Sequence, residues 1–169
     1  MNTLQKIGFG GSCHWCTEAI FLSIKGVLSV DQGWISPKNE EAFSEAVIVE
    51  FDSRIVSLNA LVGIHLHTHS CTSTHSMRSK YRSAVYLMDN AQELPVLNAI
   101  QEYQHDFKAP IITEVVMFGD FRINSQNYLN YYFKDPEKPF CENIVNPKLR
   151  ELIARYGNLV DKEKVAHLL

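Results

Sequence analysis

Residues 4–26 read LQKIGFGGSCHWCTEAIFLSIKG, and this stretch contains the transition on which both the fold and the chemistry depend. Residues 4–9 predict a short strand that runs into Gly-Gly-Ser. A helix is expected over residues 13–25, because apolar side chains recur on one face and Gly26 follows the last turn. Cys13 therefore stands where a strand becomes a helix.

The rest of the sequence predicts an α+β protein. The expected order begins strand, helix, strand, strand, helix, strand, which is that of a ferredoxin-like β-α-β-β-α-β core. The chain has no internal repeat or linker, so we expect one domain over residues 1–169 with a C-terminal helical extension. The remaining expected elements are strands at 27–34, 44–51, 81–88 and 111–118, helices after Ser57, at 92–106 and from Asn146 to Gly157, a helical stretch beginning near Asp120, and a loosely attached polar helix at 158–169.

Composition narrows the class of protein. The net charge of −3 argues against a general attraction to nucleic acid or to an anionic membrane. No apolar run is long enough to span a bilayer, and residues 1–9 lack the apolar stretch of a signal peptide. We therefore expect a cytoplasmic protein with reduced cysteines, where cysteine points to catalysis or metal binding more than to a structural disulfide.

Cys13 and Cys16 can form a redox pair, contribute to a metal site or fill the core. The free N–H groups and the dipole at a helix start favour an anion, so they lower the pKa of a thiol there. The two preceding glycines allow a tight turn and leave room for a ligand. This setting favours a nucleophilic thiolate at Cys13 over the buried filler that free cysteine more often is. Cys16 lies one helical turn on, within reach of Cys13, but the intervening His-Trp is unlike thioredoxin-type dithiols.

Several segments resemble, in the same order, those of the A-class peptide methionine sulfoxide reductases. The likeness covers most of the chain, and several ordered motifs are more specific than one alone. GSCHWCTE at 11–18 resembles the family's Gly-Cys-Phe-Trp signature, and KGVLSVDQGW at 25–34 resembles the segment after the catalytic helix. SEAVIVEF at 44–51 resembles the family's His-Ala-Glu-Ala-Val strand, and KYRSAVY at 80–86 resembles its Gln-Tyr-Arg-Ser-Ala block. NYYFKDPEKPFCENIVNPKL at 130–149 resembles the C-terminal region of one branch of the family.

This resemblance implies an α+β two-layer roll with a ferredoxin-like core, and reduction of methionine-S-sulfoxide, free or in proteins. By the same resemblance, Cys13 attacks the sulfoxide sulfur and becomes a sulfenic acid, while Glu45 protonates the sulfoxide oxygen. A second cysteine then condenses with the sulfenic acid to a disulfide, which a thioredoxin-type reductant reduces. We expect no cofactor, and no nucleic-acid or membrane partner.

The residue types agree with such a site. A sulfoxide oxygen is a poor leaving group until it is protonated, so an acid is required. Glu45 is expected on the same strand face as three apolar side chains, where a carboxyl can hold its proton near neutrality, although a strand-end glutamate in water is the plainer alternative. Trp15 is a candidate for the wall of a slot for the S-methyl group, or a core residue. Tyr81 is a candidate for a hydrogen bond to the substrate oxygen.

The substrate-binding residues depart from the family pattern. His14 replaces the family's Phe, which makes the methyl pocket more polar and adds a titrating group. Ser76 replaces the Asp that usually stands five residues before the family's Tyr, and the loop ISPKNEEAF at 35–43 is too short to supply a second Tyr. Phe43 replaces a His. We assign His14, Trp15 and Ser76 to substrate binding and expect weak activity or an altered substrate.

The resolving cysteine is Cys141 or Cys16. Cys16 is close to Cys13, but its thiol must approach across the helix start in strained geometry. Cys141 lies in KPFCENIVNP, between prolines and without clear secondary structure, so it can move. In the resembling family a cysteine of the C-terminal segment commonly resolves, and no role falls on Cys71. Cys141 is therefore the first candidate and Cys16 the second.

A histidine-rich segment, HLHTHSCTSTH at 65–75, remains to be explained. It offers nitrogen and sulfur ligands, but His65, His67 and His69 simply alternate, without a familiar zinc spacing and without a nearby CxxC partner. In the resembling family this segment is the loop that lines the active site. We therefore interpret it as a polar loop and expect no metal.

Three functions stay open at this stage. The first is a sulfoxide reductase, the second a general dithiol oxidoreductase using Cys13 and Cys16, and the third a catalytically weakened, metal-binding or non-enzymatic relative. Glu45 favours the first over the second, because disulfide exchange needs no acid for a sulfoxide oxygen. Ser76 and the shortened loop favour the third.

Overall fold

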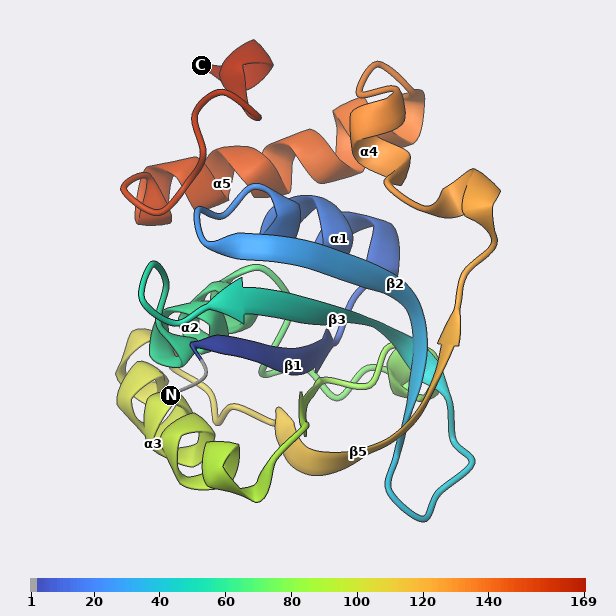
Figure 1. The fold of residues 1–169 in the computed structure, drawn as a ribbon, viewed down its shortest axis with the longest axis vertical. Coiled ribbons are helices and arrows are strands. Elements are labelled where there is room, and N and C mark those ends of the chain that lie inside the picture. Colours follow the sequence, from blue (N-terminus) through green and yellow to red (C-terminus); the bar gives the residue numbers. More distant parts are fainter. Residues whose placement is uncertain (1–2) are drawn as a thin grey trace.

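The computed structural model describes residues 3–169. Residues 1 and 2 lie outside it. They belong both to the expected domain and to the segment 1–9 that lacks signal-peptide features. In the described part no helix is long and apolar enough to cross a membrane. The elements are β1 (Leu4–Gly10), α1 (His14–Leu22), β2 (Val27–Pro37), β3 (Ser44–Asp52), α2 (Leu58–His67), β4 (Ala84–Leu87), α3 (Glu93–Tyr103), β5 (Glu114–Ile123), α4 (Tyr131–Lys134) and α5 (Asn146–Tyr156), as drawn in Figure 1.

The strands close into a barrel in the order β1-β3-β2-β5-β4, with β4 pairing back onto β1. Neighbouring strands are antiparallel except β4 and β5, which run parallel. Through β4 the chain follows the predicted order of strand, helix, strand, strand, helix, strand. The prediction of an α+β protein is confirmed.

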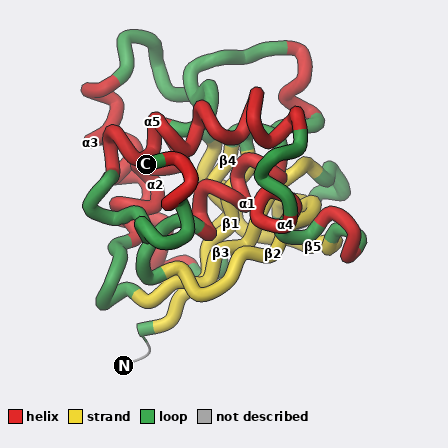
Figure 2. Tube along the Cα trace, turned by 90° about the horizontal axis from the view of Figure 1, so that it is seen from above, coloured by secondary structure: helices red, strands yellow, loops and turns green. Residues whose placement is uncertain are grey.

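The main apolar core lies between the strands and the helices that cover them. Val47, Val49 and Phe51 alternate on one face of β3 and are fully buried, which follows from the period of two in a strand. Phe9 of β1 stacks on Phe21 of α1 with ring centroids 4.6 Å apart. Helix α1 is thereby held against the sheet, and α5 packs over α1 and α2 (Figures 1 and 2).

Two predicted elements between residues 81 and 123 differ from the structure. Strand β4 begins at Ala84, so Tyr81 precedes it in a bend rather than opening it. The predicted helical stretch near Asp120 is wrong, because β5 continues to Ile123. Pairing with β2, in which Asp120 stands opposite Ser36, holds this segment extended despite its Gly-Asp sequence.

The prediction of a loosely attached polar helix at 158–169 is also wrong. Val160 forms an isolated β-bridge with Ile24, and the N–H of Asp161 donates to the carbonyl of Ser23 at 2.8 Å. Val165 is fully buried in the main core. The segment contains a bridge, turns and a short 3₁₀ helix, because its few apolar residues reach the core in this form. It fastens the turn between α1 and β2.

Val165→Ala should lower the free energy of unfolding by about 1.5–2.5 kcal/mol, because it removes two buried methyl groups and leaves a cavity. Urea denaturation followed by circular dichroism measures this change. The control is Leu169→Ala in the same segment, whose side chain is 68 % exposed and whose loss should change stability by less than about 0.5 kcal/mol. Equal, small effects of both substitutions would mean that the segment is loosely attached after all.

Candidate active site

Cys13 occupies the N-cap position of α1, directly after the turn that leaves β1. Gly11 has φ +147°, and a Cβ built on it would lie 2.5 Å from Cδ2 of His69. No other residue type fits there, because both the backbone conformation and the space require glycine. The carbonyl of Cys13 accepts the N–H groups of Cys16 and Thr17 at 3.1 and 3.2 Å, which begins the helix.

The surroundings of the Cys13 thiol favour its anionic form. Its pKa is lowered, first by a hydrogen bond from the thiol of Cys16 and then by the N–H groups of Trp15 and Cys16, against burial and the charge of Glu45, which raise it. The pKa of Cys16 is raised, because its proton is held by Cys13 and because it is buried. Of the two thiols, Cys13 is therefore the one that loses its proton more readily, while Cys16 keeps its own, which agrees with the predicted role of Cys13 at a helix start.

A pocket of about 530 Å³ opens beside Cys13. Tyr81 lines it, so the bend before β4 brings this predicted site residue to the thiol. Ser76 does not line it: Ser76 is exposed at the start of a short 3₁₀ helix, and its neighbours His75 and Met77 face the pocket instead. The other lining residues are Gly11, Ser12, His67, Thr68, His69, Ser70, Lys148 and Glu151.

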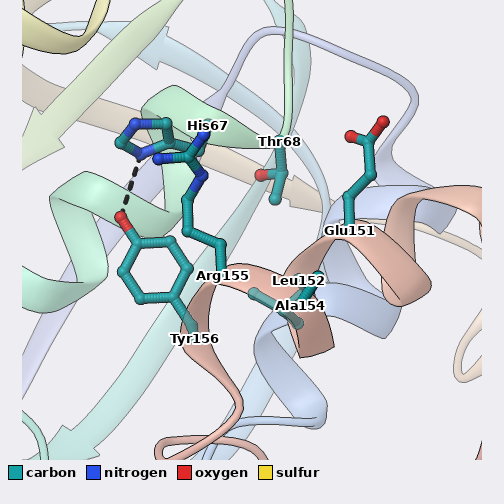
Figure 3. Close-up of a pocket in the computed structure, with 7 residues that line it drawn as sticks. All are labelled: His67, Thr68, Glu151, Leu152, Ala154, Arg155 and Tyr156. Carbon is teal, nitrogen blue, oxygen red and sulfur yellow. Dashed lines mark hydrogen bonds between the residues drawn. The ribbon is translucent and has the colours of Figure 1, made fainter.

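A second pocket, of about 570 Å³, lies between the end of α2 and α5 (Figure 3). The hydroxyl of Tyr156 lies 2.9 Å from Nδ1 of His67 at its edge. This second pocket shares His67, Thr68 and Glu151 with the pocket beside Cys13, so the two pockets adjoin. Together they leave room for more than one side chain next to Cys13.

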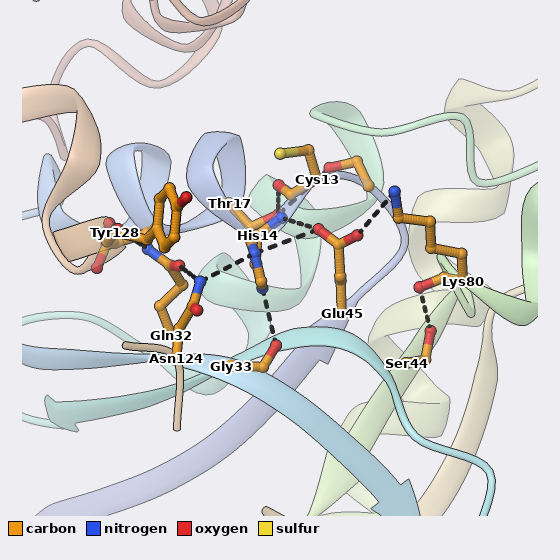
Figure 4. Close-up of polar contacts among 12 residues, drawn as sticks. Cys13, His14, Thr17, Gln32, Gly33, Ser44, Glu45, Lys80, Asn124 and Tyr128 are labelled. Carbon is orange, nitrogen blue, oxygen red and sulfur yellow. Dashed lines mark hydrogen bonds and ion pairs between the residues drawn. The ribbon is translucent and has the colours of Figure 1, made fainter. Parts of the chain in front are cut away.

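Glu45 lies beneath the start of α1, only 5 % exposed (Figure 4). Its Oε1 accepts the backbone N–H of His14 at 3.3 Å and lies 3.4 Å from Nε2 of the same residue. Its Oε2 lies 3.5 Å from Nζ of Lys80. The first residues of β3 thus carry a buried carboxyl to the underside of Cys13, close enough for its charge to act on the thiol.

His14 lies against β2 and does not line the pocket beside Cys13. Its side chain is buried, with Nδ1 2.9 Å from the carbonyl of Gly33 and the ring edge-on to Trp34 at 5.1 Å. Its pKa is lowered, chiefly by burial. The structure therefore brings His14 to Glu45 rather than to the pocket in which the sequence places it.

Trp15 is half-buried and stacks with two tyrosines of the C-terminal segment. Its ring lies 4.1 Å from that of Tyr131 and 5.5 Å from that of Tyr128, and Phe140 meets it edge-on at 5.4 Å. Within residues 3–169 its indole N–H has no hydrogen-bond partner. The aromatic cluster joins the nucleophile helix to the chain that leads to Cys141.

Cys141 is fully buried and begins the π-helical turn Cys141–Val145 that leads into α5. The prediction of a segment without secondary structure is therefore wrong, because apolar contacts at Cys141 and Val145 order the chain before α5 begins. Cys141 lies close enough to Cys16 for its charge to raise the pKa of Cys16. All four cysteines are free thiols, and Cys71 is buried apart from the pocket lining.

The histidine-rich segment braces the turn before Cys13. Nε2 of His65 lies 2.7 Å from the carbonyl of Gly10, and the ring of His69 covers Gly11. Burial lowers the pKa of His65 well below its ordinary value and that of His69 to about 4, so both rings are neutral at physiological pH. Nowhere in residues 3–169 do three His, Cys, Asp or Glu side chains gather as a metal site would require.

Four further residues near the site could not be expected there from the sequence: Gln32, Arg78, Lys80 and Asn124. Arg78 donates to the carbonyls of Gly11 and Tyr81 at 2.9 and 2.8 Å, which ties the loop before β4 to the nucleophile turn. Each is an ordinary polar or charged residue, in a strand, a loop or, for Arg78, the short 3₁₀ helix Ser76–Ser79. Only the pairing of distant strands reveals its position.

Comparisons with known proteins agree on one family. The family model described as Peptide methionine sulfoxide reductase matches residues 5–158. A curated relative, Peptide methionine sulfoxide reductase MsrA of Psychrobacter sp. (strain PRwf-1), is 30% identical over 175 residues, covering 94% of this chain and 100% of its own.

Solved structures show the same fold. Methionine sulfoxide reductase A of Corynebacterium diphtheriae superposes with a TM-score of 0.65 at 20% identity, over 80% of this chain and 77% of its own. Mxr1 from Saccharomyces cerevisiae in complex with Trx2 superposes with a TM-score of 0.61 at 17% identity, over 76% and 85%. At these identities the likeness is one of fold.

Cys16→Ala should slow the alkylation of Cys13 by iodoacetamide at about pH 7 by roughly three- to tenfold. The substitution removes the S–H donor, so the pKa of Cys13 rises and less thiolate is present. Mass spectrometry of the Cys13 peptide over time measures the rate. Cys71→Ala is the control, since Cys71 is not among the groups that act on Cys13, and it should leave the rate unchanged. An equal rate in Cys16→Ala and wild type would contradict the assigned hydrogen bond.

Proposed function

The chain belongs to the peptide methionine sulfoxide reductase family, and we propose that it reduces methionine-S-sulfoxide, free or in proteins, with Cys13 as the nucleophile. One observation carries this proposal. The thiol with the lowered pKa lies between an open pocket and the buried carboxyl of Glu45. A nucleophile, a substrate space and an acid are the parts that sulfoxide reduction needs.

The reaction follows from these parts. The sulfur of Cys13 attacks the sulfoxide sulfur while Glu45 gives a proton to the oxygen. The oxygen passes to Cys13, methionine leaves, and Cys13 becomes a sulfenic acid, so its sulfur is oxidised by the two electrons that reduce the substrate. A second thiol then displaces water from the sulfenic acid and forms a disulfide.

Among the residues proposed to bind substrate, Tyr81 is better placed than Trp15 or Ser76. Tyr81 lines the pocket and can donate its hydroxyl to the substrate oxygen. The adjoining second pocket gives space for residues that flank an oxidised methionine in a polypeptide. Trp15 contacts tyrosines instead of an open slot, and Ser76 faces solvent, so binding relies more on Tyr81 and the α5 wall than the family pattern implies.

Membership of this family also suggests a more detailed description of the fold. We infer a two-layer α/β roll with a ferredoxin-like core and a C-terminal helical extension. The contiguous strands β4-β1-β3-β2, with α1 packed against them and apolar residues of α2 in the same core, support it.

A thioredoxin-type protein is the proposed reductant. Mxr1, which shares this fold, has been solved in complex with Trx2. A cycle of thiol and disulfide needs such a reductant, and the cytoplasm is the compartment in which thiols are kept reduced. The contact between Cys13 and Cys16 also fits a general dithiol oxidoreductase, which would reduce disulfides but not sulfoxides.

Cys13→Ser should abolish reduction of methionine-S-sulfoxide, because the hydroxyl of the substituted serine is far less nucleophilic than a thiolate. Alanine variants of the other three cysteines should each complete one turnover. Each variant is incubated with each sulfoxide epimer, with dithiothreitol for continued turnover and without it for a single turnover. The methionine that forms is then measured by chromatography. Continued turnover by Cys13→Ser would remove the nucleophile from the mechanism, and disulfide reduction without sulfoxide reduction by wild type would favour the dithiol oxidoreductase.

The resolving step is proposed to use Cys141, with Cys16 as the alternative. Cys141 lies beside Cys16 in a π-helical turn, and Cys16 already contacts Cys13. Reduced protein treated with one equivalent of methionine sulfoxide should give a disulfide between Cys13 and Cys141 when peptides are mapped by mass spectrometry. A bridge between Cys13 and Cys16 that forms equally fast in Cys141→Ser would assign the role to Cys16.

A further inference from the structure

His14 is a buried side chain for which the reaction above has no use. It belongs to α1 beside the nucleophile, but it points away from the pocket toward β2 and Glu45 (Figure 4). Both ring nitrogens have defined neighbours, and these neighbours determine where its proton lies. The inference below rests on the proposed function, since it concerns the source of the proton that Glu45 donates.

The first ring nitrogen, Nδ1, carries a hydrogen. It lies 2.9 Å from the carbonyl oxygen of Gly33, and a carbonyl can only accept. A neutral imidazole has one N–H, so the other nitrogen, Nε2, presents a lone pair. Burial lowers the pKa of His14, which favours the neutral ring.

The neighbours of the second ring nitrogen, Nε2, agree with a lone pair at that position. The amide nitrogen of Gln32 donates to Glu18 at 2.8 Å and to the carbonyl of Tyr128 at 2.9 Å, so its oxygen faces Asn124. Asn124 donates to that oxygen at 2.7 Å through Nδ2, and the same Nδ2 lies 3.4 Å from Nε2 of His14. A donor therefore faces Nε2 as well, and the ring is assigned as the Nδ1–H tautomer from both sides.

The lone pair of His14 Nε2 faces the carboxyl of Glu45. Its Oε1 lies 3.4 Å from Nε2, and both atoms are acceptors unless one of them bears a proton. With water excluded from both side chains, a proton between them replaces this repulsion by a hydrogen bond. The charged or titratable groups that face the pair are Lys80, at 3.5 Å from Oε2, and the thiol of Cys13.

We propose that His14 and Glu45 share one proton, which the pair delivers through Glu45 to the sulfoxide oxygen and regains from the thiol of Cys13. His14 touches no substrate atom, so it is a positioning residue that acts through Glu45. The ring keeps a proton available at the carboxyl although Lys80 stands beside it.

The proton count balances over the step. Cys13 loses one proton as its sulfur attacks, the sulfoxide oxygen gains one, and that oxygen ends as the hydroxyl of the sulfenic acid. The pair loses one proton and takes one back, so it is unchanged. No oxidant or reductant is needed beyond the sulfoxide and the thiol.

The proposal predicts a change in pH dependence. As the pH rises, the pair loses its proton, and without His14 only Glu45 can hold it. The upper limb of the kcat profile with dithiothreitol should therefore move to lower pH in His14→Phe, with kcat at about pH 8 reduced at least tenfold and KM changed less than about twofold.

Two variants separate this role from packing. His14→Asn keeps an amide donor for the carbonyl of Gly33 but cannot carry the proton, so its profile should shift like that of His14→Phe. Trp34→Phe disturbs the ring contact of His14 without removing a nitrogen, and its upper limb should match that of wild type. A wild-type upper limb in both His14 variants would overturn the proposal.

A measurement without turnover separates failure of the proposal from failure of the proposed function. In Cys13→Ser protein, long-range nitrogen–proton spectra of the His14 ring should show hydrogen on Nδ1 and none on Nε2 in the neutral form, and Glu45→Gln should shift the titration of that ring. Hydrogen on Nε2, or a titration unaffected by Glu45→Gln, would overturn the shared proton even if wild type reduces the sulfoxide. Absence of sulfoxide reduction by wild type, with the spectra as expected, would overturn the proposed function instead.

Discussion

The backbone turn at Gly11 is the constraint on which the site depends. With φ at +147° and the ring of His69 against it, the chain can leave β1 and start α1 within three residues. The free N–H groups of the new helix then lie at Cys13, where they stabilise a thiolate. The same turn brings the thiol above the carboxyl of Glu45, because β3 pairs with β1 directly below it. A longer or looser turn would separate the thiol of Cys13 from the carboxyl of Glu45.

Much of this arrangement could be predicted from local sequence. Periodicity in β3 places Glu45 on the buried face with Val47, and the glycines before Cys13 indicate a tight turn into a helix. Such features depend on neighbours in the chain, whose effect on conformation is strong. The thiol at the helix start, the buried carboxyl and the α+β class therefore follow from short segments and one family resemblance.

The remaining features depend on pairings between distant segments. Lys80 and Asn124 reach Glu45 and His14 only because the loop before β4 and the end of β5 are carried there by the barrel. The tail at 158–169 has a polar sequence, yet two buried valines, Val160 and Val165, attach it to the core. The histidine-rich segment gives no local sign that its rings support Gly11 instead of a metal. Long-range contacts of this kind leave no pattern in a single sequence.

The stacking of Trp15 has an optical consequence. The chain has two tryptophans, and Trp15 lies between the thiols of Cys13 and Cys16 in sequence, with Tyr131 on its face and Phe140 at its edge. Phe140 directly precedes Cys141, so a disulfide that draws Cys141 toward α1 changes what covers the indole. If the proposed disulfide between Cys13 and Cys141 forms, the emission of Trp15 should differ between the dithiol and disulfide forms, and the chain would contain its own fluorescent indicator of redox state.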